Sequence, residues 1–296
     1  MDNAVIYLLV TVSAFFWAAN FVLAGPILAD LSPLWAAALR FLLGAALMFI
    51  IAGIRRENIF GPLRRHMGAY LLLGAVGITA FNLLFFHALQ STSANSAALI
   101  MATNPLLTTL LAAVVLGERP TLRHLMALPV ALIGVAVVIS QGDMHRLAAL
   151  HVAHGDLLML AANVSWALYN VLGRRYMPQA SPVVNTTWIM AVGAVLLTCI
   201  ALASGAHIAA LDLGASLALA VMVLGGTVLA YLFWSMGIMR LGAARTAIFL
   251  NLVPVFAMLI SASIGTPPTA PQLLGGLLVL GGVSISMVAP RRTALA

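Results

Sequence analysis

The chain has 296 residues, of which 63% are hydrophobic and 7% are charged, whereas about 25% of the residues in an average soluble domain are charged. This composition excludes a soluble globular protein, which needs more polar surface. All 14 basic residues are arginines, and the formal net charge is +7. The arginines lie singly or in pairs between apolar segments, without the basic stripe of a nucleic-acid-binding protein. We therefore expect no nucleic-acid partner and interpret the arginines as signals of membrane topology.

Hydropathy predicts an all-α integral membrane protein in the lipid bilayer. Apolar segments of about 20 residues can cross the hydrocarbon core, and lipid offers no partners to an open strand edge. Ten transmembrane helices are expected, at residues 4–24, 34–53, 67–89, 94–116, 122–140, 155–174, 182–204, 214–240, 243–264 and 271–289. No basic segment precedes the first apolar run, so we expect it to be an uncleaved helix.

The arginines predict how these helices are oriented. If the N-terminus is cytoplasmic, the inner connections and the tail contain Arg55, Arg56, Arg64, Arg65, Arg119, Arg123, Arg174, Arg175, Arg240, Arg245, Arg291 and Arg292. Only Arg146 falls in an outer connection, and Arg40 lies within the second helix. Because cytoplasmic loops are enriched in basic residues, we expect both termini in the cytoplasm of a bacterium and the chain in its inner membrane.

The sequence also repeats itself after a shift of 149 residues. Trp17 then aligns with Trp166, Ser32-Pro33 with Ser181-Pro182, and Pro105 with Pro254. Similarity at this scale indicates duplication. The predicted organisation is a first repeat at 1–140, an outer linker at 141–154 and a second repeat at 155–296. Five helices per repeat give the halves opposite topology, which is typical of transporters with a site near the bilayer midplane.

Aromatic and amide side chains recur three to four residues apart in several helices, a spacing that places them on one helix face. The residues predicted to bind substrate are Trp17, Asn20, Phe21, Asn82, Phe85, Phe86, Asn95, Asn104, Trp166, Tyr169, Asn170, Tyr231, Trp234 and Asn251. Rings would stack on an apolar or aromatic side chain, and amides would bind carboxylate and amino groups. The alternatives are hydrogen bonds between helices and an interfacial aromatic belt.

Two prolines and two ionisable residues complete the candidate set. Pro105 and Pro254 interrupt the predicted helices at equivalent positions, so they are predicted hinges, with static kinks as the alternative. Arg40 either extends outward towards Asp30 or faces a cavity where it meets a substrate carboxylate. His87 is either a hydrogen-bonded packing residue or a group that makes transport sensitive to pH.

The distribution of the other reactive groups argues against coupled transport and catalysis. All seven acidic residues lie in loops, tails or helix ends, although proton-driven exporters usually hold a carboxylate within the membrane. We therefore expect facilitated movement or exchange. Three linker histidines, His145, His151 and His154, make only a weak zinc pattern, and no phosphate-binding glycine loop follows a strand. No metal, no cofactor and no enzymatic activity are predicted.

The tryptophan in the first helix of each repeat and the run NPLLTTLLAAVVLGERP at 104–120 resemble the EamA-type members of the drug/metabolite transporter superfamily, and most of all the bacterial exporters of aromatic amino acids. The resemblance implies a monomeric secondary transporter that exports aromatic or other neutral amino acids, or related small metabolites, by alternating access. The chain departs from the pattern where Thr266 occupies the region corresponding to Glu118. The alternatives are a broad-specificity drug or cation exporter and an intramembrane lipid-modifying enzyme.

Overall fold

The computed structural model describes residues 2–92, 97, 100–140, 142–143, 145, 154–205, 210–263, 265 and 267–287, without the side chains of Phe21, Val22, Ile139 and Ser261. The predicted site residue Asn95, the side chain of Phe21 and most of the predicted linker lie outside this part of the chain. Every element described is helical. The longer α-helices are α1 (Asn3–Asp30), α2 (Pro33–Ile54), α3 (Phe60–Gly74), α4 (Phe81–Ala88), α6 (Asn104–Leu116), α7 (Leu122–Ser140), α9 (His154–Tyr176), α10 (Pro182–Ala203), α11 (Leu213–Val221), α12 (Ala230–Leu241), α14 (Leu252–Ser263) and α15 (Ala270–Met287).

Length and hydropathy identify six of the described segments as long and apolar enough to cross a membrane. They are Asn3–Asn20, Pro33–Ile54, Phe60–Ala88, Pro182–Ala203, Leu213–Leu241 and Ala243–Ile260. Asn104–Leu116, Leu122–Val138 and Ala270–Ile285 are apolar but shorter. The long helix α9 is more polar, with Asn163, Ser165 and Asn170 buried along it. The described part of the chain is thus all-helical, with six clearly apolar helices long enough to cross a membrane, and the count of ten spans stays a prediction.

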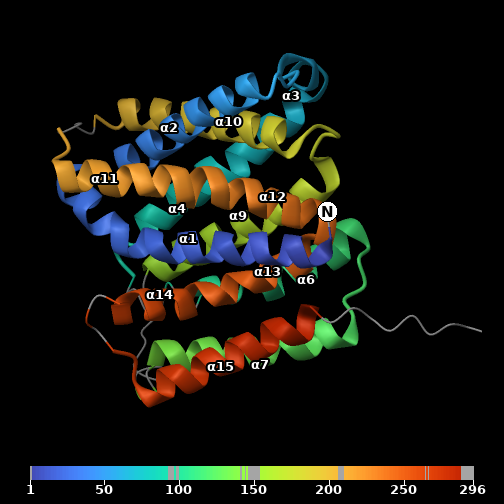
Figure 1. The fold of residues 1–296 in the computed structure, drawn as a ribbon, viewed down its shortest axis with the longest axis vertical. Helices are drawn as coiled ribbons and strands as arrows, with labels where there is room; N and C mark the ends of the chain where they lie inside the picture. Colours follow the sequence, from blue (N-terminus) through green and yellow to red (C-terminus); the bar gives the residue numbers. More distant parts are fainter. Residues whose placement is uncertain are drawn as a thin grey trace, which may run out of the picture.

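The helices lie side by side in one bundle (Figure 1). The α2–α10 pair forms one flank and the α7–α15 pair the other, with α1, α4, α9 and α12 between them. Small residues allow the α7–α15 pair to approach closely, since a Cβ atom on Gly275 would lie 2.7 Å from the Gly134 carbonyl oxygen. These two helices therefore pack against each other at the edge of the bundle, and the other helices form its centre.

The two halves share local structure at positions 149 residues apart. The hydroxyl oxygens of Ser32 and Ser181 accept hydrogen bonds from the backbone N–H three residues later, at 3.3 and 3.2 Å, and each caps a helix that begins with proline. A π-helical segment, η1 (Ala75–Ala80), joins α3 to α4, and a second, η2 (Met222–Leu229), joins α11 to α12. The shift that aligns the sequences places η1 over the last six residues of η2.

Two predicted helix ends differ from the structure. The first helix was expected to end at 24, but α1 continues through Pro26 to Asp30. The third was expected to begin at 67, but α3 begins at Phe60 and contains a break at His66, where φ is −131° and ψ is 28°. The earlier start adds the polar residues Arg64, Arg65 and His66 to the beginning of this helix.

The structure places the two predicted hinge prolines just after helix breaks, and not within continuous helices. The helix before α6 is interrupted at Thr103, and Pro105 lies in the first turn of α6. The ninth predicted helix consists of α13 (Ala243–Ala247), the 3₁₀ segment η3 (Ile248–Asn251) and α14, with Pro254 in the first turn of α14. Proline lacks an N–H group, so it fits the first turn of a helix and interrupts the α-helical ladder before it. The breaks are placed where hinges were predicted, and bending there stays a prediction.

Candidate functional site

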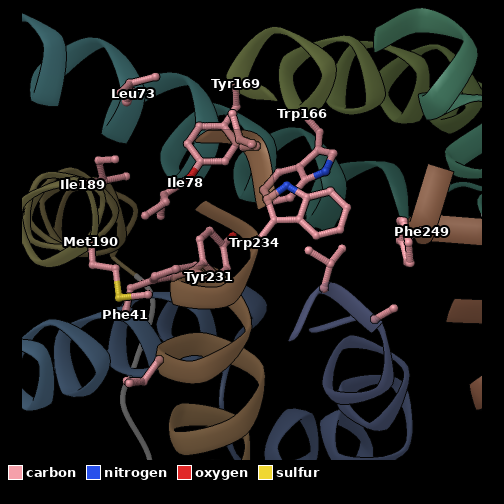
Figure 2. Close-up of a cluster of buried hydrophobic side chains, with 14 of the residues drawn as sticks. Phe41, Leu73, Ile78, Trp166, Tyr169, Ile189, Met190, Tyr231, Trp234 and Phe249 are labelled. Carbon is pink, nitrogen blue, oxygen red and sulfur yellow. The ribbon is translucent and has the colours of Figure 1, made fainter. Parts of the chain in front are cut away.

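An aromatic cluster occupies the centre of the bundle. The ring of Trp17 on α1 lies 5.3 Å from that of Trp166 on α9, 4.8 Å from Trp234 and 5.8 Å from Tyr231, both on α12. Tyr169 joins the cluster 5.1 Å from Trp166. These ring separations are typical of favourable aromatic pairs. Figure 2 shows Trp166, Tyr169, Tyr231 and Trp234 gathered between the helices. The tertiary structure therefore unites five residues that the sequence predicted on three helices.

Helical spacing and two hydrogen bonds position these rings. Trp166 and Tyr169 are three residues apart on α9, and Tyr231 and Trp234 are three apart on α12, so each pair shares a helix face. The indole N–H of Trp17 donates to the Gly226 carbonyl oxygen in η2 at 3.0 Å. The indole N–H of Trp234 donates to Asn170 Oδ1 at 2.8 Å. The π-helical segment thus contributes directly to the cluster, as such segments often do at functional sites.

Several buried polar atoms beside the aromatic cluster lack a hydrogen-bond partner among the described residues. They are Asn20 Oδ1, Trp166 Nε1 and Asn170 Nδ2. Leaving such a group unpaired costs about 1–3 kcal/mol, so unsatisfied atoms are rare in native interiors and require an explanation. Here they supply one acceptor and two donors on residues of the cluster. A small solute with both polar ends and an apolar part could satisfy them.

A small pocket adjoins this region. It has a volume of about 30 Å³, enough for two or three waters at roughly 10–15 Å³ each. Apolar residues of α1, α2, α4, α11 and η2 line it, including Ala24, Ala37, Phe86, Leu219 and Met222, and Arg40 is the charged residue among them. Its walls lie near Asp30 and Leu213, at the helix ends opposite to those that carry most of the arginines.

Arg40 faces this pocket and does not pair with Asp30. One of its terminal nitrogens, Nη2, donates to Asn82 Oδ1 at 3.3 Å, and its guanidinium lies 4.8 Å from the centre of the Phe41 ring. Asp30 instead accepts a 3.1 Å hydrogen bond from the backbone N–H of Asp212. In this structure Arg40 therefore contacts Asn82 instead of the predicted partner Asp30, and its role in binding stays a prediction. Phe41 connects the pocket to the aromatic cluster, because its ring contacts the Arg40 guanidinium and lies 5.5 Å from Tyr231.

Other predicted residues lie away from the cluster or at its border. Phe85 stacks on Phe81, which in turn lies 5.1 Å from Trp166, and Phe86 lines the pocket. His87 is exposed, and its Nδ1 lies 2.7 Å from the Leu83 carbonyl oxygen. This geometry favours the interpretation of His87 as a hydrogen-bonded histidine outside the pocket.

Two predicted amides have environments of their own. Asn104 is fully buried and donates to Asn163 Oδ1 at 2.7 Å. Asn163 donates in turn to the Ile100 carbonyl oxygen at 2.6 Å and to Thr103 Oγ1 at 2.9 Å, so this network fastens the break before α6. Asn251 is buried in η3, and neither side-chain atom has a partner among the described residues. Sequence reasoning missed Asn163, although its place three residues before Trp166 was a usable signal.

The arginine-rich helix ends are closed by contacts that sequence reasoning did not foresee. Arg174 at the end of α9 lies 3.7 Å from Glu118 after α6, measured between Nε and Oε1, and donates to the Met239 carbonyl oxygen of α12 at 2.5 Å. Arg175 donates to the Val115 carbonyl oxygen of α6 at 2.8 Å. These contacts join three helices at the end opposite the pocket. Arginines that served only as topology signals in the sequence therefore also cross-link the bundle.

A bundle of apolar helices, six of them long enough to cross a membrane, around a polar and aromatic centre is the architecture of a multi-pass membrane protein. The EamA-like transporter family matches the chain twice, at residues 4–140 and 153–288. The chain belongs to this family, and the predicted resemblance to the drug/metabolite transporter superfamily is confirmed. The family is one of transporters.

Relatives with similar sequences cover almost the whole chain. An "Uncharacterized transporter YyaM" of Bacillus subtilis is 39% identical, over 96% of this chain and 93% of its own length. A "Probable amino-acid metabolite efflux pump" of Salmonella typhimurium is 30% identical, over 94% of both chains. A "Probable terminal-alkyne amino-acid exporter" of Streptantibioticus cattleyicolor is 28% identical, over 81% of this chain and 77% of its own length. A solved crystal structure at 20% identity shares the fold, with a TM-score of 0.81 over 96% of each chain.

Proposed function

We propose that the protein exports neutral amino acids, aromatic ones among them, or related small metabolites from the bacterial cytoplasm. The observation that carries this proposal is the aromatic cluster with its unsatisfied donors and acceptors. An amino acid has an apolar side chain for the rings and two polar ends for Asn20, Trp166 and Asn170. The efflux and exporter names of two relatives support the same class of solute.

In this proposal the chain works as a monomer in the inner membrane with both termini in the cytoplasm. Ten spanning helices form two inverted five-helix repeats, and the equivalent serine caps and π-helical segments support the duplication. The solute site is central, and access alternates by bending at the breaks before Pro105 and Pro254. The Arg174–Glu118 contacts close the cytoplasmic end, while the pocket lies towards the outer end.

Transport in this scheme is facilitative or an exchange of solutes. Protons driving uphill export would need a titrating group on the solute path, and carboxylates are the usual choice. All seven acidic residues of the chain lie outside the middle of the helices, and the most deeply placed, Asp30 and Asp156, are in terminal turns. A pH gradient that drives uphill accumulation of an amino acid in liposomes would contradict this part of the proposal.

Counterflow in liposomes tests the function. Purified protein is expected to exchange labelled phenylalanine or threonine for unlabelled solute, and a cationic dye is expected not to move. Trp17→Ala and Trp166→Ala remove the central ring pair and are expected to abolish counterflow while the protein remains folded. The proposal fails if the wild-type protein moves no amino acid, and movement of the dye alone would favour a drug exporter.

A further inference from the structure

We propose that Arg40 is the binding residue for a carboxylate group, so that the transported solute must carry one. The inference rests on the proposed function and deepens it, because it selects amino acids and other carboxylates over amines and cationic drugs. It starts from an unneutralised cation beside the aromatic cluster.

The position of Arg40 makes an unpaired charge costly. Arg40 is the eighth residue of α2, which places it about 10 Å from the start of that helix at 1.5 Å per residue. Its side chain is only partly accessible, and its Nε is buried without a partner among the described residues. An ionised group in an apolar interior is retained where it pairs or serves the function.

The neighbours of Arg40 do not neutralise it. Nη2 has one hydrogen bond, a 3.3 Å contact with the neutral amide of Asn82. The ring of Phe41 contributes a cation–π contact at 4.8 Å. All seven acidic residues of the chain are among the described residues, and none of them forms an ion pair with Arg40.

The guanidinium geometry fits a carboxylate. Arginine presents parallel N–H donors that bind the two carboxylate oxygens together, and the free Nε with a neighbouring Nη offers such a pair. The pocket as it stands has room only for waters, so a whole solute binds when the proposed access movement widens it. A carboxylate on Arg40 would then direct its apolar substituent to the side where Phe41, Phe86 and Tyr231 lie. The same charge would repel an organic cation, which disfavours the alternative of a cation exporter.

Matched acids and amides test the proposal directly. The probes are L-phenylalanine, L-leucine and L-threonine, each compared with its own amide, which has the same side chain and amino group but no carboxylate. Binding is measured in phosphatidylcholine nanodiscs by the rise in melting temperature and by competition. We expect each acid that binds to be about 10–100-fold tighter than its amide, as for the loss of a charged hydrogen-bonded pair. Arg40→Gln is expected to remove this preference, and Arg55→Gln, at an exposed arginine, to retain it.

The controls separate binding from folding. Without solute, Arg40→Gln should melt at or above the wild-type temperature, since the variant no longer holds an uncompensated buried charge. If Arg40→Gln does not fold, Arg40→Lys keeps the charge without the paired donors, and a preference for acid over amide reduced about tenfold would support the proposal. Hydrocinnamate has the ring and the carboxylate but no amine, so Arg40-dependent stabilisation by hydrocinnamate supports the carboxylate site even where no amino acid moves.

Two outcomes would overturn the assignment. The assignment is wrong if the amides bind the wild-type protein as tightly as the acids, or if the Arg40→Gln variant keeps the preference for acids. Amino-acid counterflow by the wild-type protein would in that case still support the proposed function, without a carboxylate site at Arg40. Adding phosphatidylglycerol tests the other source of an anion: if its phosphate abolishes the Arg40-dependent preference, Arg40 binds a lipid headgroup and not the solute. If the wild-type protein exchanges no amino acid, the proposed function is refuted, whereas Arg40-dependent binding of hydrocinnamate still tests the carboxylate site by itself.

Discussion

The contacts of Arg174 at the arginine-rich end of the bundle allow a quantitative prediction about gating. Arg174 contacts Glu118 through an ion pair of 3.7 Å and the Met239 carbonyl oxygen through a hydrogen bond of 2.5 Å. If these contacts hold the end closed, the variants Glu118→Gln and Arg174→Ala should open it to different extents. Glu118→Gln removes the ion pair alone, and Arg174→Ala removes both contacts.

The structure sets the size of each effect. The two side chains of the ion pair are 38% and 36% exposed, so solvent screens the pair and its contribution is about 0.2–1 kcal/mol. Glu118→Gln should therefore raise the open population by about 1.4–5-fold. Arg174→Ala also loses a hydrogen bond worth roughly 1 kcal/mol at a partly exposed position, which brings the total to about 1–2 kcal/mol, or roughly 5–30-fold.

Cysteine labelling measures the opening. Ala243 is fully buried and packs with Ala112 and Val171 at this end, so Ala243→Cys, in a Cys199→Ser background, reports exposure to a membrane-impermeant maleimide. The labelling rate follows the open population when opening and closing are fast. Arg55→Gln, at an exposed arginine in the same predicted set of inner connections, is the control and should leave the rate unchanged.

The order of the two effects is the sharpest part of this prediction. Raising the ionic strength from about 0.05 to 0.5 M should reduce the difference between wild type and Glu118→Gln, because salt screens exposed charges. Equal labelling of Arg174→Ala and wild type would refute the closing role. A larger effect of Glu118→Gln than of Arg174→Ala would refute the assignment of most of the stabilisation to the backbone contact.

Three further variants test the site and the packing. Trp17→Phe loses its indole hydrogen bond and should lower amino-acid counterflow by at least severalfold. The control Trp188→Phe loses a similar bond of 2.8 Å outside the aromatic cluster and should keep the wild-type rate of counterflow. Equal counterflow by the two variants would contradict the role of the cluster. Gly275→Val should destabilise the protein by about 1–3 kcal/mol through overpacking, because its Cβ would lie 2.7 Å from a carbonyl oxygen of α7. Gly281→Val, with open space around its Cβ, is the matched control in thermal melts, and equal melting temperatures would refute the close contact. Asn163→Leu loses hydrogen bonds of 2.6 and 2.9 Å and should lower stability by about 1–3 kcal/mol; faster proteolysis near Thr103 is expected, and an unchanged cleavage pattern would count against the network.

Local sequence patterns predicted several parts of this structure. Ser-Pro at 32–33 and 181–182 predicted equivalent helix positions, and both serines cap helices with the same backbone angles. Spacing of three residues predicted that Trp166 shares a face with Tyr169, and Tyr231 with Trp234. Prolines at 105 and 254 indicated interruptions in two helices, because proline removes a backbone donor wherever it stands.

Other features depended on partners distant in the sequence. The polar helix α9 lies in the centre because α4, α6 and α12 surround its amides, which no hydropathy window records. The π-helical segments have no signature as simple as a proline. The two possible directions of Arg40 could not be separated from the sequence, since the choice depends on where Asn82 lies relative to Asp30.

The sequence by itself determined that the chain is a helical membrane protein with duplicated halves, since long apolar segments, arginine positions and repeated residues act through local chemistry and transfer to lipid. It also named the five residues that form the aromatic cluster. Only the tertiary structure decided which of them meet, because the contacts between their rings join residues as distant as Trp17 and Trp234, 217 positions apart. Only the tertiary structure likewise shows that Arg40 contacts Asn82 and lines the pocket, since the direction of a side chain depends on the neighbours that pack around it.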